Sequence, residues 1–487
     1  MTSFRSKANS AIIHFDVRIL AIAIYAVLAL TVASPVRAQQ VITIGIGTQD
    51  MTTNTVTTGV VIRELKLLEK HLPRTGAYAK VTYRLDWQNF TSGPPVTNGM
   101  MANKLQFGAM GDFPLVVNGF TFQSNPESKS QLVAVAAYNI NGSGNGVMVH
   151  RDSPFFELAD LRGKVLSVPF GSAAHGMVLK AMQDRGWGPN EIRLVSQTPE
   201  VGSTNLQERK VDSHANFVPF AELLPFRGFA RKIFDGVETN APTWHGVVVR
   251  TDFAEKHPEI VTAYVAAIIE ANAWVRNDPQ AAAEQIARWT GIDKEVVYMF
   301  LGPSGIMTLD PTIKPELIED AVEDAKVLQN LGRMGEFDVR RWVNSAFVEA
   351  AFRRAGLDYA AQVAAKSNYE IRGDDKFCNR PVTEPRKAGQ IWVEGERITV
   401  HASPACALGA FAALRAAGKK INVIYLFDEV LGTKLFADHA FFSIAKTGPQ
   451  AVITPFMLKK DAEAHAARTG GRVGSFDDAL RAVQAGG

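Results

Sequence analysis

Short apolar runs alternate with amphipathic stretches over the first half of the chain. The run from Lys80 to Trp87 places Val81, Tyr83 and Leu85 on one face and polar residues on the other, as a half-buried strand requires. Strands are predicted at residues 41–47, 80–87, 105–110, 163–169, 211–218 and 246–250, with helices at 60–71 and 175–185. Strands that alternate with helices favour parallel sheets with crossover connections. The chain is therefore predicted to be α/β.

The second half changes character twice. Residues 253–365 are predicted to be mostly helical, and a polar stretch over residues 366–376 is suited to a linker. Beyond it, residues 389–400 predict a hairpin, and a small α+β unit follows, with helices at 407–417 and 459–469 and strands at 422–427 and 440–445. The expected organisation is an N-terminal segment 1–38, a large domain 39–365, the linker 366–376 and a small α+β domain 377–487.

Composition agrees with a globular protein of several domains. The chain has 487 residues, of which 46% are hydrophobic and 21% charged, and this length is more than one compact domain accommodates. Residues 1–38 contain Arg5, Lys7, Arg18 and Arg37 against Asp16, which accounts for the whole net charge of +3. The remainder is neutral, which argues against a nucleic-acid or anionic membrane partner.

The first 38 residues have the pattern of an export signal. Basic residues precede an apolar run from Ile19 to Ala33, and small residues at Val36 and Ala38 suit a signal-peptidase site. The alternative is an uncleaved membrane anchor, although the run is short for a bilayer span. We expect a cleavable signal peptide, a periplasmic mature protein, and no membrane span in the mature chain.

Four stretches carry a family resemblance over residues 41–350. They are Asp86–Gly93, Gly108–Pro114, Leu161–Pro169 and Val248–Pro258, in matching order and spacing. In these the chain resembles periplasmic binding proteins of the nitrate/sulfonate/taurine class of ABC importers. The resemblance implies a two-lobed binding fold (type II), a small-molecule ligand between the lobes, and an ABC permease with its ATPase as partners.

Candidate ligand residues follow from where the predicted strands end. In open α/β sheets ligands lie beyond the carboxyl ends of strands, where helix N-termini favour anions. The candidates are Gln49, Asp50, Ser92, Gly93, Asp112, Phe113, Ser172, His175, Phe217 and His245. Several have simpler alternatives: Ser92 and Asp112 as helix caps or turn residues, Phe217 as a core residue, and His245 as a residue of crossover-strand packing.

Asp112 changes the expected ligand chemistry. It stands where the resembled family commonly has a small hydroxyl residue, and Ala173-Ala174 also replace hydroxyls. A carboxylate in an anion site is costly without a cation. A ligand with a positive part, such as an amine or a bound metal, would compensate for it, and His175 and His245 can bind metals when neutral or anions when charged.

The C-terminal residues 376–482 resemble the copper-binding accessory proteins of nitrous oxide reductase maturation, the NosL-like family. The matching stretches are Lys376–Cys378, Gln390–Val400, Ile453–Met457 and Gly470–Asp477. That family's Cys-Gly-Met motif, with soft ligands for Cu(I), reads Cys378-Asn379-Arg380 here. Candidate metal ligands are Cys378, Cys406, His401 and Met457. The two cysteines form a structural disulfide, a thiolate metal site, or two unrelated thiols, and Met457 has the alternative of core packing.

No catalytic motif supports an enzyme. The sequence has no Gly-x-Ser-x-Gly, no phosphate loop and no His-Glu-x-x-His. The predicted function is therefore a periplasmic solute-binding protein that captures a small organic anion for an ABC importer. The alternative is a periplasmic copper-handling protein with Cu(I) in its C-terminal domain.

Overall fold

The structure is a computed structural model that describes residues 40–367, 369–447 and 450–485. The predicted signal peptide lies outside the described residues. Within the described residues, we find no helix with the length and apolar character needed to cross a membrane. Residues 40–42 and 74–84 group into one small compact unit, in which Tyr78 and Tyr83 stack with ring centroids 6.5 Å apart, and the rest of the described chain forms the second unit.

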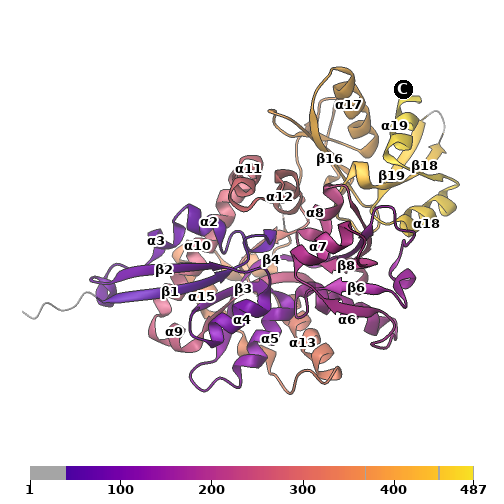
Figure 1. The fold of residues 1–487 in the computed structure, drawn as a ribbon. Helices are drawn as coiled ribbons and strands as arrows, with labels where there is room; N and C mark the ends of the chain where they lie inside the picture. Colours follow the sequence, from indigo (N-terminus) through magenta and orange to yellow (C-terminus); the bar gives the residue numbers. More distant parts are fainter. Residues whose placement is uncertain (1–39, 368, 448–449, 486–487) are drawn as a thin grey trace, which may run out of the picture. The chain divides into compact units, whose positions relative to one another are not determined.

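A six-stranded sheet forms the first lobe, in the order β11-β4-β10-β3-β1-β2 (Figure 1). Its strands are β1 (Val41–Thr48), β2 (Thr82–Asn89), β3 (Phe107–Gly111), β4 (Ser130–Asn139), β10 (Thr243–Arg250) and β11 (Thr308–Leu309). Every residue of β3 and β10 is buried, because helices cover both faces of the sheet. In β2 the predicted alternation of exposed and half-buried residues is confirmed.

Helices from both halves of the chain enclose this sheet. They are α2 (Val60–Glu64), α3 (Leu67–His71), α4 (Gly93–Met101), α5 (Asp112–Phe122), α9 (Thr251–Lys256), α10 (Pro258–Asn277), α11 (Pro279–Thr290), α12 (Lys294–Leu301), α13 (Pro315–Asn330), α14 (Val339–Trp342), α15 (Ala346–Arg354) and α16 (Tyr359–Ala364). The prediction of one helix over residues 60–71 is wrong. Lys66 adopts a left-handed conformation (φ 53°) between α2 and α3, and both apolar ends, Val60–Ile62 and Leu67–Leu68, are buried.

A five-stranded sheet forms the second lobe, in the order β7-β6-β8-β5-β9. Its strands are β5 (Gly146–His150), β6 (Val165–Val168), β7 (Arg193–Ser196), β8 (Ser213–Asn216) and β9 (Ala230–Asp235), and its helices are α6 (Ala173–Asp184), α7 (Pro199–Gln207) and α8 (Phe220–Phe226). The α/β class and the two-lobed binding-protein fold expected from the sequence are confirmed.

The expectation of parallel sheets is confirmed for the βαβ units and needs correction for β5 and β10. Strands β1 and β3 are parallel, as are β6, β7 and β8, but β10 runs antiparallel to β3 and β4, and β5 runs antiparallel to β8 and β9. Strand β5 is the first strand after the chain leaves the first lobe for the second, and β10 is the first strand after the chain returns to the first lobe. Each therefore enters its sheet opposite to the strands of the βαβ units.

Two segments connect the lobes and pack closely against each other. The first follows β4, and the second links the 3-10 helix η4 (Gly236–Thr239) to β10. Gly142 has φ +96°, and a Cβ there would lie 2.3 Å from the carbonyl oxygen of Ala241. The close approach of the two connecting segments therefore requires glycine at position 142.

The C-terminal domain contains three small sheets. Their orders are β12-β13, β15-β14-β16-β17 and β19-β18-β20. The strands are β12 (Asp374–Asp375), β13 (Arg380–Pro381), β14 (Gly389–Val393), β15 (Thr399–His401), β16 (Ile421–Phe427), β17 (Lys434–Phe436), β18 (Phe441–Thr447), β19 (Gln450–Phe456) and β20 (Arg472–Gly474), and the helices are α17 (Pro404–Ala416), α18 (Lys459–Thr469) and α19 (Phe476–Ala485). The predicted hairpin is the antiparallel pair β14–β15, and the helix predicted over residues 459–469 is α18.

The segment predicted as a linker packs against the large domain. Ser304 donates its backbone N–H to the Tyr369 carbonyl and accepts from the Ile371 N–H through its hydroxyl, and Ile371 is buried. Further on, Tyr425 donates from its hydroxyl to the carbonyl of Glu295 at 2.8 Å. The C-terminal domain is therefore fixed to α12 by side-chain contacts as well as by the chain itself.

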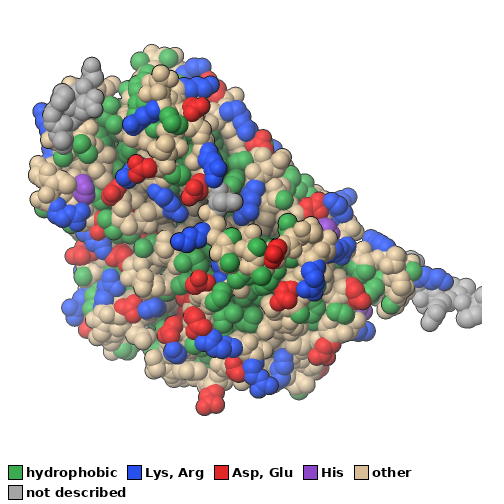
Figure 2. All heavy atoms as spheres, turned by 180° about the vertical axis from the view of Figure 1, so that it is seen from behind, with side chains coloured by type: hydrophobic (Ala, Val, Ile, Leu, Met, Phe, Trp, Pro, Cys, Tyr) green, Lys and Arg blue, Asp and Glu red, His purple; other side chains and the backbone are tan. Residues whose placement is uncertain are grey.

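The molecular surface carries mixed charges. On the face shown in Figure 2, Lys and Arg side chains lie among Asp and Glu side chains and hydrophobic groups. This distribution is unlike the continuous basic surface that nucleic-acid binding uses.

Candidate functional site between the lobes

The ends of β3, β6 and β10 meet where the two lobes touch. A Cβ on Gly111 would lie 3.1 Å from the Cβ of Ala173 and 3.4 Å from Nε2 of His245. The Phe113 and His175 rings pack edge to face, with centroids 6.0 Å apart. The structure thus brings together the predicted residues Phe113, His175 and His245, beside the N-termini of α5 and α6.

Asp112, the first residue of α5, is held by backbone donors. Its Oδ1 accepts the N–H of Phe113 at 2.7 Å, and its Oδ2 accepts the N–H of Trp244 at 3.1 Å. Burial raises the pKa of this carboxyl to about 6, and the two N–H donors oppose the shift. The interpretation of Asp112 as a residue bound to backbone N–H groups is confirmed, and its place at the inter-lobe contact leaves a ligand role open to test.

His175 is buried in a neutral form with an unused donor. The backbone N–H of Gly171 donates to its Nδ1 at 3.1 Å, so the proton of the neutral ring is on Nε2, which has no hydrogen-bond partner. Burial, with a smaller contribution from the charge of Arg333, lowers its pKa to about 4. Ser172 caps α6 by accepting the N–H of His175 at 3.3 Å.

His245 faces the segment that follows β1. Its Nδ1 lies 3.1 Å from Nδ2 of Asn54, and burial lowers its pKa to about 3. His245 and its neighbours in β10 pair with β3 on one side of the strand and with β4 on the other. The ring is therefore positioned by crossover-strand packing. The ring edge beside Gly111 also places it at the inter-lobe contact, and its ligand role stays a prediction.

A threonine-rich segment, residues 52–58, is a feature of the site that the sequence reasoning missed. It follows β1 and is fully buried, and the hydroxyl groups of Thr53 and Thr57 and the Asn54 Oδ1 have no hydrogen-bond partner. Buried polar atoms of this kind are usually paired. The sequence signal was available, since five threonines and one asparagine within seven residues after a predicted strand are unusual for a buried segment.

Gln49 and Asp50 have internal partners. Gln49 donates to the carbonyl of Ala109 at 3.1 Å, which joins the ends of β1 and β3. Asp50 accepts from Thr48 at 2.8 Å and pairs with Arg63 at 2.9 Å. These contacts give both residues a role in shaping the loop after β1.

Ser92, Gly93 and Phe217 have local structural roles. Ser92 occupies the N-cap position of α4 with no hydrogen bond from its side chain to the helix. A Cβ on Gly93 would lie 2.5 Å from the Cβ of Pro114, so glycine allows α4 and α5 to approach. Phe217 is buried and packs edge to face on Phe220, with centroids 5.9 Å apart, as in its core interpretation.

A small cavity adjoins this contact. Its volume is about 30 Å³, and three of its lining side chains are Asp112, Asp320 and Asp324. Trp244 donates its indole N–H to Asp320 at 2.8 Å. Burial is the main cause that raises the pKa values of Asp320 and Asp324 well above normal, and the neighbouring aspartates add to it. Sequence reasoning did not find Asp320 or Asp324, which lie on the helix α13.

The candidate metal ligands of the C-terminal domain lie in two places. Cys378 and Cys406 form a disulfide, and Asp375 and His401 lie beside it, with His401 Nδ1 3.2 Å from Asp375 Oδ1. Ligand atoms of Asp375, Cys378 and Cys406 lie within 4.8 Å of one another. Disulfide sulfurs are not thiolates, so the thiolate site is absent in this oxidised form.

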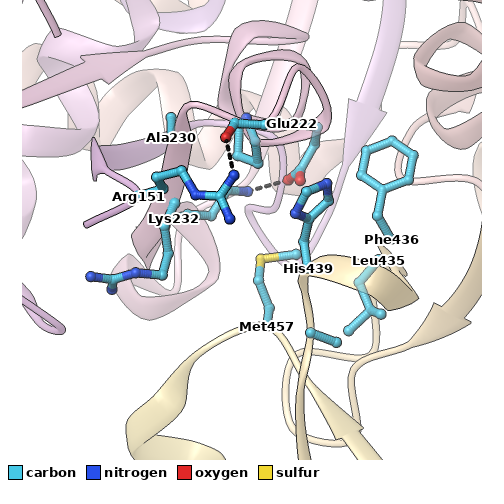
Figure 3. A pocket seen from close by; sticks show the side chains of 12 residues that line it. Arg151, Glu222, Ala230, Lys232, Leu435, Phe436, His439 and Met457 are labelled. Carbon is cyan, nitrogen blue, oxygen red and sulfur yellow. Dashed lines mark hydrogen bonds and ion pairs between the residues drawn. The ribbon is translucent and has the colours of Figure 1, made fainter. Parts of the chain in front are cut away.

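Met457 lies elsewhere, in a cavity of about 170 Å³ between the second lobe and the C-terminal domain (Figure 3). His439 and Phe436 line the same cavity, opposite Glu222 and Lys232. The prediction that Met457 joins the two cysteines and His401 in one ligand set is corrected, because it packs in this cavity and in the hydrophobic core of the domain.

Comparisons with known proteins agree with this architecture. A family model described as "NMT1/THI5 like" matches residues 122–282. The taurine-binding periplasmic protein of Escherichia coli is 26% identical over 278 residues, which are 54% of this chain and 84% of that protein.

Solved structures show the same fold. The alkanesulfonate-binding protein of Xanthomonas axonopodis pv. citri bound to MOPS has a TM-score of 0.53 at 20% identity, and covers 62% of this chain and 98% of its own. The periplasmic aliphatic sulphonate binding protein of Escherichia coli has a TM-score of 0.51 at 21% identity, and covers 62% of this chain and 92% of its own. Nearly all of each solved chain is matched by about three fifths of this one, so this chain carries additional residues.

Proposed function

We propose that this protein is a periplasmic solute-binding component of an ABC importer that binds a small organic anion between its two lobes and delivers it to a permease. The named relatives are binding proteins for sulfonates or taurine, which supports this proposal and favours a binding protein over an enzyme. Closure of the lobes around the ligand would give the permease a form that it can distinguish from the open protein.

The observation that carries the proposal is an unused buried donor at the inter-lobe contact, together with unused hydroxyl groups in the segment after β1 that His245 faces. The Nε2 of neutral His175 and the hydroxyls of Thr53 and Thr57 are buried without partners. The N-termini of α5 and α6 add backbone donors at the inter-lobe contact, near His175. Oxygen atoms of a small anion would accept hydrogen bonds from these donors. A neutral imidazole donates such a hydrogen bond without the cost of a buried charge.

The test is calorimetric titration of the mature protein with alkanesulfonates, taurine, nitrate, bicarbonate and aromatic carboxylates. His175→Phe keeps an aromatic ring and removes the donor, and Thr53→Val removes one hydroxyl with little change in shape. Each is expected to weaken anion binding about tenfold or more, the usual cost of a lost hydrogen bond to a charged group.

Thr312→Val is the matched control, because Thr312 is also fully buried with an unpartnered hydroxyl but lies between β11 and α13. It is expected to bind anions like the unmodified protein. No binding of any anion by the unmodified protein, or equal affinity in His175→Phe, would contradict the proposed anion site.

A second candidate function, Cu(I) handling by the C-terminal domain, is favoured by the grouping of Cys378, Cys406, Asp375 and His401. It requires the disulfide to be reduced, since soft thiolates are the ligands that suit Cu(I). Reduced protein should then bind one Cu(I) in competition with a chelator, and Cys378→Ser should abolish it. Unchanged affinity in Cys378→Ser would exclude the thiolate site.

A further inference from the structure

The small cavity beside the inter-lobe contact is lined by an excess of carboxyl groups. Asp112 enters it from α5, and Asp320 and Asp324 enter it from α13, one helical turn apart. Lys180 of α6 also lines the cavity, but its Nζ is bound to both carboxylate oxygens of Asp184, at 2.9 and 3.0 Å. Around the cavity there are therefore three acidic side chains and one basic side chain, and the basic one is already paired.

Two polar atoms around the cavity have no hydrogen-bond donor. Asn145 lines the cavity and is 3% exposed, and its Oδ1 has no hydrogen-bond partner. Its Nδ2 donates to Thr243 Oγ1 at 3.4 Å, while the Thr243 hydroxyl donates to the carbonyl of Gly142 at 2.8 Å. The Asp324 Oδ2 is also buried without a partner. Both unused atoms are acceptors, and a buried acceptor without a donor is costly.

The spacing of the carboxyl groups distinguishes an ammonium group from a metal ion. A hard metal ion with oxygen ligands at about 2.4 Å holds them within about 4.8 Å of one another. Among the described residues, the group of three acidic, His or Cys side chains that meets this distance is Asp375, Cys378 and Cys406, and the three aspartates do not. An ammonium nitrogen donates over about 2.8 Å, so it can reach acceptors that lie further apart.

We propose that this cavity is the subsite for a primary ammonium group of the bound ligand, with Asp112, Asp320, Asp324 and Asn145 Oδ1 as its acceptors. Its volume of about 30 Å³ leaves room for a group of the size of an ammonium head. Resting on the proposed function, the inference narrows the ligand to a small zwitterion, whose anionic end occupies the proposed anion site.

The subsite can be tested without knowing the ligand. Thermal unfolding of the full mature protein is measured with methylammonium chloride and with sodium chloride at equal ionic strength. Methylammonium should raise the unfolding temperature above its value in sodium chloride, because it binds the folded state alone. Asp324→Asn should lose this increment, and because the Asp324 Oδ2 has no hydrogen-bond partner, the substitution is mild for the fold. Asp320→Asn should lose it as well.

Glu316→Gln is the matched control, since Glu316 is an exposed acidic residue on α13 that does not line the cavity. It should retain the methylammonium increment. Equal unfolding temperatures in the two salts, or an increment that Asp324→Asn retains, would overturn the subsite.

Matched ligands then separate this inference from the proposed function. Aminomethanesulfonate should bind at least about tenfold more tightly than methanesulfonate, the scale of a hydrogen bond to a charged group, and Asp324→Asn should remove the difference. Failure of both sulfonates to bind, with the methylammonium effect intact, would reject the anion site and keep the ammonium subsite. Tighter binding of methanesulfonate would reject the ammonium subsite alone.

Discussion

The indole nitrogen of Trp244 donates a hydrogen bond of 2.8 Å to Asp320, while the backbone nitrogen of the same tryptophan donates to Asp112 at 3.1 Å. One residue at the start of β10 therefore fixes carboxyl groups from α5 and α13. Because β10 begins where the second connecting segment re-enters the first lobe, this acidic cavity lies beside that segment, and Ala241 and Pro242 line it.

The acidic cavity predicts an unusual dependence of stability on pH. The pKa of Asp112 is raised to about 6 in the folded protein, so between its normal value and about 6 the folded state binds more protons than the unfolded state. Stability from this carboxyl is present at low pH and is lost as pH rises through about 6. The raised pKa values of Asp320 and Asp324 have the same sign.

Asp324→Asn should therefore raise the unfolding temperature of the ligand-free protein at pH 8 and leave it nearly unchanged at pH 4. Thermal unfolding followed by circular dichroism at the two pH values measures this difference. A lower unfolding temperature at pH 8 would show that Asp324 is stabilised as an anion and that burial does not dominate its ionisation.

The buried histidine of the site predicts the opposite trend. The pKa of His175 is lowered to about 4, so below its normal value near 6.5 the unfolded state takes up the proton first. The stability that comes from a neutral His175 is complete above pH 6.5 and is lost as pH falls toward 4. When the pH falls from 6.5 to 4.5, the unfolding free energy of the His175→Phe variant should thus decrease less than that of the unmodified protein.

Urea unfolding of both proteins at the two pH values isolates this contribution, because His245 and the other histidines are common to both. The difference should approach about 2 kcal/mol, an upper value for a shift of this size over that range. Parallel loss of stability in both proteins would show that His175 is already protonated in the fold.

Much of the fold could be predicted from local patterns, but the site could not. The bounds of α18 follow from apolar spacing and from Gly470, which takes the left-handed C-cap conformation (φ 66°). Strands β5 and β10 are almost wholly buried, so their apolar sequences carry no signal of direction, and the mixed sheets could not be foreseen. Asp112 and His175 could be proposed as site residues because ligands lie beyond strand ends, where helices begin. His245, expected before a strand at 246–250, lies inside β10.

The acidic cavity was missed for a different reason. Asp320 and Asp324 lie about 200 residues after Asp112 in an amphipathic helix, where acidic residues at this spacing usually face solvent. Only the packing of α13 against α5 turns them inward. The disulfide, by contrast, was one of three interpretations that the two cysteines allowed, and only the fold distinguished among them.

The buried charges beside the C-terminal domain give a prediction on stability. Lys232 is bound to Glu222 (Figure 3) and, at 2.8 Å, to Asp235. All three side chains are at most 5% exposed. Replacing Lys232 by Met leaves two uncompensated carboxyl groups, which should cost about 3–5 kcal/mol of unfolding free energy. Arg151→Met, which removes a largely exposed charge from the same cavity, should cost less than about 1 kcal/mol.

Chemical unfolding with fluorescence and circular dichroism distinguishes the two variants. Because burial raises the pKa of Glu222 to about 7, part of the cost of Lys232→Met should be recovered at pH 5, where this carboxyl takes up a proton. A variant as stable as the unmodified protein at pH 8 would show that the ion pairs contribute nothing beyond the cost of burying them.

The disulfide should stabilise the C-terminal domain and leave ligand binding between the lobes unchanged. Cys378 and Cys406 are 28 residues apart in sequence, and closing a loop of that length stabilises a fold by about 3–4 kcal/mol in the chain-entropy model. The double variant Cys378→Ser, Cys406→Ser should therefore unfold at lower urea concentration. The disulfide lies beside Asp375 and His401, away from the lobe contact at Gly111 and Ala173. Equal anion affinity in the two proteins, measured by calorimetry, is expected, and a large loss of affinity would show that the C-terminal domain takes part in binding.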